Sequence, residues 1–129
     1  MSFAKEMLAA DAVLSKFGHE AFLPHSTTEY VQGALKKVDS ESFKRKIERN
    51  LIEDHYKLIQ KSDAVLVLNY DKRSVSNYIG GSGFLEMGFA YILKKKIFLL
   101  NPIPDMEFIK AEIEAMQPIV LYGDLSLVR

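Results

Sequence analysis

The chain has 129 residues, of which 48% are apolar and 26% are charged, a balance typical of a single globular domain with a buried core. Seventeen basic and seventeen acidic residues cancel, which excludes a whole-molecule attraction to nucleic acid or to an anionic membrane. The sequence has no cysteine, so disulfides, thiol catalysis and thiolate metal sites are excluded. It has neither an apolar run of membrane-spanning length nor the apolar core of a signal peptide, and we expect a cytoplasmic protein.

The first predicted element is an amphipathic helix over residues 3–17, because apolar residues recur there at alternating steps of four and three. Gly18 should end this helix in the left-handed conformation. A short strand is expected over residues 21–23, while residues 25–40 give mixed signals and stay unassigned. The apolar positions of the helix are Phe3, Met7, Ala10, Leu14 and Phe17.

A long helix is predicted next, capped by Ser40 and running to about Lys61. Its basic cluster is either a solvated helix face or a set of phosphate contacts. That cluster comprises Lys44, Arg45, Lys46 and Arg49. The side chains expected to point inward are Phe43, Ile47, Leu51, Ile52, Leu58 and Ile59.

Three apolar runs, at residues 64–68, 97–100 and 119–122, predict buried strands, and helices are expected between them at 84–93 and 105–116. Asp105 should cap the last helix, with Phe108, Ile109 and Ile113 inward. Such alternation predicts an α/β, three-layer, Rossmann- or flavodoxin-like parallel sheet with helices on both faces. A doubly wound domain normally begins with a strand, so we expect that one domain over residues 1–129 lacks its first strand, roughly ten residues with its turn.

The stretch from Gly80 to Ala90 lies where a parallel sheet places its ligand, beyond the carboxyl end of a strand. Gly80, Gly81, Ser82 and Gly83 would leave backbone N–H groups free to meet a phosphate or sugar oxygen, or would simply form the turn. If Gly83 were the N-cap, Glu86 would be the third helical residue. Its carboxylate would then be either a capping group or a reactive nucleophile.

These residues resemble a known family. Ser62-Asp63-Ala64-Val65-Leu66-Val67-Leu68-Asn69, the glycine loop, Glu86-Met87-Gly88-Phe89-Ala90 and Lys96-Ile97-Phe98-Leu99-Leu100 are similar to the nucleoside 2-deoxyribosyltransferase-like family, over about residues 54–104. The resemblance implies that Glu86 is the nucleophile, in a reaction that proceeds as in retaining glycosidases. Related members hydrolyse deoxynucleoside monophosphates. The transferases carry an aspartate six residues before the glutamate, where this chain has Gly80, and its loop is closer to an uncharacterised branch.

The remaining candidate residues surround Glu86 in the sequence. Asn77 and Tyr78 could hydrogen-bond to and stack on a base, a role that Tyr70 could share, although each tyrosine could also pack on the rim. The residues expected to contact substrate are Asn69, Asn77, Tyr78, Gly80, Gly81, Ser82 and Gly83. The possible supporting residues are Asp54, His55 and Asp63.

The resulting hypothesis is an enzyme that cleaves or transfers the N-glycosidic bond of a (deoxy)nucleoside or its 5'-monophosphate. The alternatives are a non-catalytic nucleotide-binding module with the same fold and a subunit that mainly dimerises. His19, His25 and His55 lack metal-ligand spacing, so we expect no metal and no other cofactor. The expected partners are a small nucleoside or nucleotide and a second copy in a homodimer, with no nucleic acid polymer and no membrane.

Overall fold

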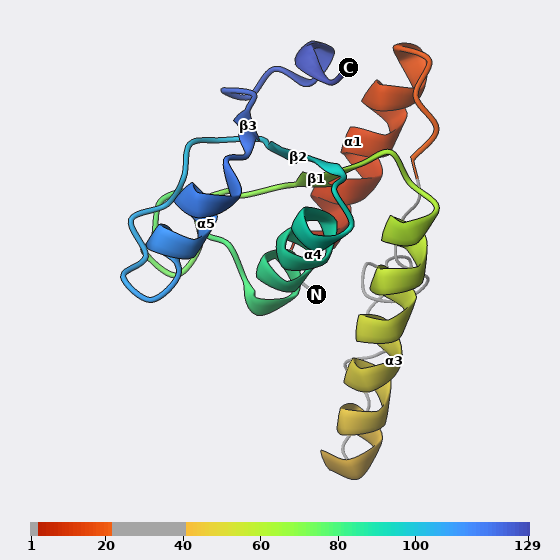
Figure 1. Ribbon diagram of the computed structural model, residues 1–129, viewed down its shortest axis with the longest axis vertical. Helices are drawn as coiled ribbons and strands as arrows, with labels where there is room; N and C mark the ends of the chain where they lie inside the picture. The colour runs from red at the N-terminus through yellow and green to blue at the C-terminus, as the bar shows by residue number, and fades with distance from the viewer. Residues whose placement is uncertain (1–2, 22–40) are drawn as a thin grey trace.

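A computed structural model describes residues 3–21 and 41–129, and in this part of the chain three parallel strands form one sheet between helices (Figure 1). The strands are β1 (Ala64–Val67), β2 (Lys96–Leu99) and β3 (Ile119–Val120), in the order β1-β2-β3. The predicted α/β fold with a parallel sheet is confirmed. The helices are α1 (Ala4–Lys16), α3 (Glu41–Gln60), α4 (Gly81–Ile92) and α5 (Lys110–Met116), followed by the 3-10 turn η2 (Leu125–Leu127).

The two faces of the sheet are covered by different helices, as strand alternation requires. One face packs against α3, α4 and α5, and its buried cluster contains Val65, Val67, Ile97, Leu99, Ile59, Met87, Ala90 and Ile113. The other face packs against α1 and η2 through a second cluster, in which Leu68 and Leu100 meet Ala10. In Figure 1, α1 accordingly lies behind the strands and α4 and α5 lie in front of them. These are the three layers that the sequence predicts.

Strand β1 lies at the edge of the described sheet, yet its side chains are covered like those of a central strand. It pairs with β2 only, in the register Ala64 to Lys96 through Val67 to Leu99, and no other described strand lies on its second side. Yet Val65 is 8% exposed and Val67 5% exposed. Leu66 between them is partly buried against the cluster on the other face. An apolar run that is covered on both faces is typical of the centre of a parallel sheet, not of its edge.

The boundaries of two helices differ from the prediction. Helix α4 begins at Gly81 with Gly80 as its N-cap, earlier than expected, so the glycine stretch is the first turn of the helix and not a loop. Helix α5 begins at Lys110 with Ile109 as its N-cap, so Asp105 does not cap it. A hydrogen-bonded turn from Met106 to Ile109 precedes the helix, and this turn leaves the Phe108 side chain 90% exposed.

The amphipathic pattern is correct for most, but not all, of the other described apolar positions. Gly18 follows α1 with φ of +85°, the left-handed ending expected for it. Ile59 and Ile113 are buried, whereas Phe17 and Ile52, also expected inward, are 53% and 40% exposed. Ala21 is not in a strand. Phe22, Leu23, residues 25–40 and the side chains of residues 41–49 and 51 lie outside the description, and with them the cap at Ser40 and the basic cluster.

Candidate functional site

Glu86 lies in the second turn of α4, not in its first. Because the helix begins at Gly81, Glu86 is its sixth residue, and the first turn contains no acidic residue. No side chain caps this helix, so the interpretation of Glu86 as a capping carboxylate is wrong. Its carboxylate is directed sideways, toward the neighbouring helix α3.

The partner of Glu86 is His55 of α3. The Nδ1 atom of His55 lies 2.9 Å from Oε1 of Glu86, and the two side chains are 8% and 18% exposed. The helices are held together beside this pair by an edge-on contact between the Tyr56 and Phe89 rings, whose centroids are 5.3 Å apart. A carboxylate in this position is oriented by one hydrogen bond and shielded from bulk water.

The second nitrogen of the same ring has no partner. Nε2 of His55 is buried and makes no hydrogen bond within the described part of the chain. A buried imidazole nitrogen normally has a hydrogen-bond partner, because leaving it unpaired costs about 1–3 kcal/mol. His55 lines two neighbouring cavities together with Glu86, so a ligand or water in either cavity is a possible partner.

The smaller cavity has a volume of about 140 Å³ and lies at the carboxyl end of β1. Its walls are the glycine turn at the start of α4, the end of β1 and the start of α1, with Glu86 and His55 on one side. The N–H groups of the first helical turn have no partner within a helix, and so they are available to an anion or a sugar oxygen. The predicted contact residues that line this cavity are Tyr78, Gly80, Gly81, Ser82 and Gly83.

One of these glycines is needed for the approach of the helix to the sheet. A Cβ atom on Gly83 would lie 3.3 Å from Cγ1 of Val67 and 3.6 Å from Cγ2 of Ile79. Glycine therefore lets the first turn of α4 lie against the end of β1. This close approach brings Glu86, one turn later, to the mouth of the sheet.

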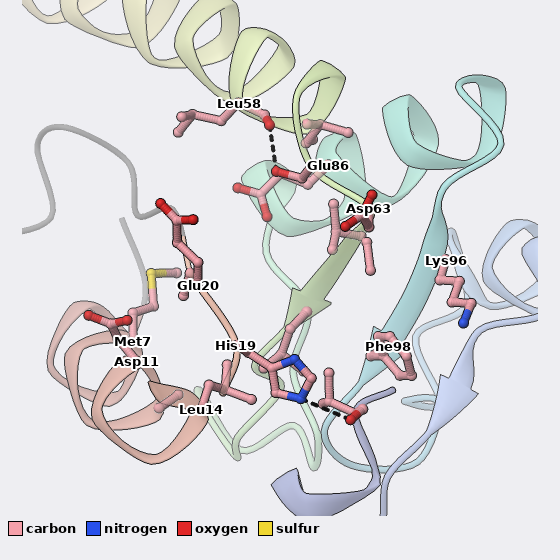
Figure 2. A pocket seen from close by; sticks show the side chains of 18 of the residues that line it. Met7, Asp11, Leu14, His19, Glu20, Leu58, Asp63, Glu86, Lys96 and Phe98 are labelled. Atoms are coloured by element: carbon pink, nitrogen blue, oxygen red, sulfur yellow. Dashed lines mark hydrogen bonds between the residues drawn. The ribbon is translucent and has the colours of Figure 1, made fainter. Parts of the chain in front are cut away.

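The larger cavity has a volume of about 730 Å³ and runs along β1 between α1 and α3. Figure 2 shows Glu86 on the α4 side of this space and Glu20 and Asp11 farther to the left, with the β1 arrow to the right of all three. His19 points across the cavity and its Nε2 lies 3.1 Å from the Val128 carbonyl oxygen. The two cavities share Met7, Leu66, Leu68, His55 and Glu86, so they form one continuous recess.

Tyr78 and Tyr70 are arranged differently. Tyr78 lines the small cavity, and its ring has the Lys72 Nζ atom 5.7 Å from its centroid. The Tyr70 ring instead packs edge-on against Phe3, with centroids 5.4 Å apart. Tyr78 is thus placed to meet a ligand, and Tyr70 stabilises the start of α1.

Asn69 does not point into the site. Its side chain is completely buried, and Nδ2 donates to the carbonyls of Asn101 and Pro102 at 2.9 and 3.1 Å. Its Oδ1 accepts from the Asn101 N–H at 2.8 Å, while Asn101 Nδ2 donates to the Asn69 carbonyl at 3.0 Å. These four hydrogen bonds join the carboxyl ends of β1 and β2. Asn69, predicted to contact substrate, lines neither cavity, and its side chain instead holds the rim together.

Three other predicted residues are also away from the small cavity. Asn77 has a left-handed backbone with φ of 59°, and its N–H donates to Asp71 Oδ1 at 2.9 Å, so it forms the turn. Asp63 lies at the opposite end of β1, beside the larger cavity. Of the two adjacent helical candidates, His55 faces Glu86 and Asp54 lines neither cavity.

Phe3, Met7 and Ile79 also line the small cavity, although no sequence pattern assigns them to the site. Phe3 and Met7 belong to the predicted apolar face of the first helix, and nothing in their spacing distinguishes a cavity wall from a core contact. Ile79 is 2% exposed and follows a turn-rich loop, where burial is hard to foresee. Only the packing of α1 over the end of β1 brings them to Glu86.

In the part of the chain that the structure describes, no group of three or more acidic, histidine or cysteine side chains is placed to hold a metal ion. No described helix is both long and apolar enough to cross a membrane. Comparison of the chain with protein-family models, curated proteins and solved structures found no match.

Proposed function

We propose that the protein cleaves or transfers the N-glycosidic bond of a (deoxy)nucleoside or its 5'-monophosphate, with Glu86 as the nucleophile. The observation that carries the proposal is the shielded pair of Glu86 and His55, 2.9 Å apart, at the carboxyl edge of a parallel sheet. Glu86 is free of the capping role that would otherwise explain it. The resemblance of this stretch to the nucleoside 2-deoxyribosyltransferase-like family supports the same role.

In the proposed reaction, a carboxylate oxygen of Glu86 attacks the anomeric carbon of the sugar and the bond from that carbon to the base breaks. The bonding electron pair leaves with the base nitrogen, which takes up a proton, and a glycosyl ester remains on Glu86. Water, or an N–H nitrogen of a second base, then attacks the same carbon and releases the carboxylate, and it loses a proton to solvent that balances the one taken up by the departing base. Water gives hydrolysis and a second base gives transfer.

The size of the small cavity supports a sugar at its centre. A volume of about 140 Å³ corresponds to roughly five water molecules, about the bulk of a pentose ring. In this arrangement the first turn of α4 contacts the sugar or its phosphate through N–H groups and the Ser82 hydroxyl. The base extends outward past Tyr78, whose ring lines the same cavity.

A second candidate function is a nucleotide-binding module without catalysis. The observation that favours it is Gly80, which stands where the transferases carry a carboxylate and which here is the N-cap of α4 without a side chain. The lining of the small cavity contains no carboxylate other than Glu86. Such a module would keep the anion-binding turn and lack a group to protonate the departing base.

The deciding experiment incubates the protein with deoxynucleosides and with their monophosphates and follows free base by chromatography. We expect base release by wild type, its loss in Glu86→Gln, and its retention in Glu112→Gln, a control at an exposed glutamate of α5. Added second base should give an exchanged nucleoside if the protein is a transferase. Equal traces from wild type and Glu86→Gln would reject the enzyme for those substrates, and calorimetric binding of the monophosphate would then support the module.

We also propose that the protein forms a homodimer through α3 and α4. Ile52 and Tyr56 of α3 are 40% and 38% exposed, and Leu85 and Ile92 of the adjacent helix α4 are 42% and 77% exposed. Leu85 and Ile92 are seven residues apart, which places them on one side of α4. Sedimentation of Ile92→Glu should give a monomer if this patch is the interface, and an unchanged dimer would refute it.

A further inference from the structure

The free edge of β1 is the least expected feature of the sheet. Natural edge strands are protected from further pairing by charge, proline, a bulge or short length, and charge and proline are absent from Ala64–Val67. The strand is instead continuously apolar, with Val65 and Val67 buried and Ala64 and Leu66 partly buried. These are properties of a strand that has a neighbour on each side.

Backbone hydrogen bonds show which groups of β1 face β2 and which face away from it. The carbonyls of Asp63 and Val67 accept from the N–H groups of Lys96 and Leu100 at 3.4 and 3.1 Å, on the β2 side. In a parallel ladder, alternate residues direct both backbone groups to the same neighbour. The N–H and C=O groups of Ala64 and Leu66 therefore point to the other side, away from β2.

That other side is the cavity of about 730 Å³. Ala64, Val65 and Leu66 all line it, and because successive residues of a strand face opposite layers, this lining belongs to the edge of β1 and not to one of its faces. The segment from Gly18 to Ala21 lines the cavity on the side opposite β1. Helix α1 covers the cavity on one face of the sheet, and helix α3 covers it on the other face.

The dimensions of the cavity match a strand. A strand rises about 3.3 Å per residue, lies about 4.8 Å from its neighbour and fills a layer about 10 Å thick, which gives roughly 160 Å³ per residue. A volume of about 730 Å³ then holds roughly four to five residues, equal to the length of β1.

The direction of such a strand follows from the position of α1. Phe3, at the start of α1, contacts Tyr70, just beyond the carboxyl end of β1, whereas Gly18 and His19, beyond its end, share the cavity with Ser62 and Asp63. A strand parallel to β1 would end beside the start of α1, as in a right-handed crossover. Its carboxyl end would also complete the wall of the small cavity.

We propose that this groove is a strand-accepting site, filled by an extended apolar strand of four or five residues from outside the 129 residues, parallel to β1 with its carboxyl end at Phe3. The occupant is apolar where it meets Leu14, Leu58, Ile59 and Val65, which line the groove. Main-chain hydrogen bonds to Ala64 and Leu66 provide the recognition, as in strand addition to other exposed sheet edges.

The test is amide hydrogen exchange, measured residue by residue by NMR, on the full chain alone and on the full chain extended upstream of Met1 by Val-Ile-Val-Ile-Ala and a short glycine turn. The extension should slow exchange at Ala64 and Leu66 at least about tenfold and leave Val65 and Val67, which already pair with β2, little changed. A control extension with proline at its second and fourth positions should have no effect. The same five residues as a separate peptide with lysine ends should protect the same two amides.

Three results would overturn the proposal. If the amides of Ala64 and Leu66 exchange as fast with the extension as without it, the groove does not accept a strand. If both amides are already protected in the chain alone and sedimentation shows a dimer, a second copy fills the groove. If they are protected in a monomer, another part of the same chain fills it. Because exchange is independent of catalysis, the outcome does not depend on the proposed reaction.

Discussion

The pair formed by His55 and Glu86 should be energetically coupled, and a double-mutant cycle measures that coupling. His55→Phe keeps the ring volume and removes both nitrogens, while Glu86→Met keeps the chain length and removes the carboxylate. Each single change leaves a partly buried polar partner without its hydrogen bond. The double variant leaves none, so it should cost less than the sum of the two.

The size of the coupling follows from burial. A hydrogen bond to a charged group contributes about 1.5–3 kcal/mol when buried. His55 is 8% exposed, but Glu86 at 18% can recover some hydration, so the lower half of that range applies. We therefore expect a coupling free energy of about 1.5–2.3 kcal/mol, measured by urea unfolding with linear extrapolation.

A control cycle uses an exposed ion pair of the same chain. The Lys110 Nζ and Asp105 Oδ1 atoms are 3.5 Å apart, with side chains 47% and 93% exposed, so their coupling should be near zero. If the His55 and Glu86 variants add to within about 0.5 kcal/mol, the two side chains do not form the pair described here. The carboxylate would then have no fixed orientation.

Three further predictions concern the frame of the site. Asn69→Ala should lower the free energy of unfolding by about 2–4 kcal/mol, because it leaves buried backbone groups unpaired, and chemical denaturation will measure it. Gly88→Ala, where nothing lies within 4 Å of the new methyl, should raise the unfolding free energy by about 0.5–1 kcal/mol, whereas the crowded Gly83→Ala should not, in the same assay. Hydrogen bonds from the Ser126 side chain and N–H lower the pKa of Asp124, so their contribution to stability is complete above the unfolded-state pKa and is lost as the pH falls through the folded-state value. Ser126→Ala should raise that pKa toward its ordinary value in an NMR titration, and an unchanged pKa would show that the hydroxyl does not act on the carboxylate.

The fold was largely predictable because its signals are local. The continuous apolar runs at Ala64–Leu68 and at 97–100 predict central parallel strands, and β1 and β2 occupy these positions within one residue. The alternation of helix and strand then limits the topology to a few arrangements. The rule that such domains begin with a strand also predicts an absent first strand, and among the described strands only β2 pairs with β1.

Helix boundaries were less predictable where local preference and packing disagree. Glycine is a poor helix former, so Gly81 and Gly83 predict a loop, yet the fit of α4 against Val67 places both in its first turn. Conversely, Asp105 is a good cap, but the helix begins only at Lys110. The consequence for the site is large, because the shift of α4 moves Glu86 away from the capping position.

Side-chain partners across the fold could not be read from spacing. Asp54 and His55 are adjacent on one helix, and only the packing angle of α3 against α4 selects His55 for Glu86. Asn69 has a polar amide side chain and directly follows a strand, as ligand-binding residues often do. Its hydrogen bonds nevertheless go to Asn101 and Pro102, which are 32 and 33 residues away. Such pairs depend on tertiary register, which a single sequence does not encode locally.

The measurement that tests the central claim most directly is the search for a sugar on Glu86. The protein is incubated with a deoxynucleoside monophosphate and the reaction is quenched in acid. The intact mass of the protein is then measured, and the modified residue is located by peptide mass spectrometry. We predict an added sugar phosphate on the peptide that contains Glu86 in wild type and in Glu112→Gln, and none in Glu86→Gln. Base release without any adduct in wild type, or an adduct that persists in Glu86→Gln, would contradict a nucleophilic role for this carboxylate.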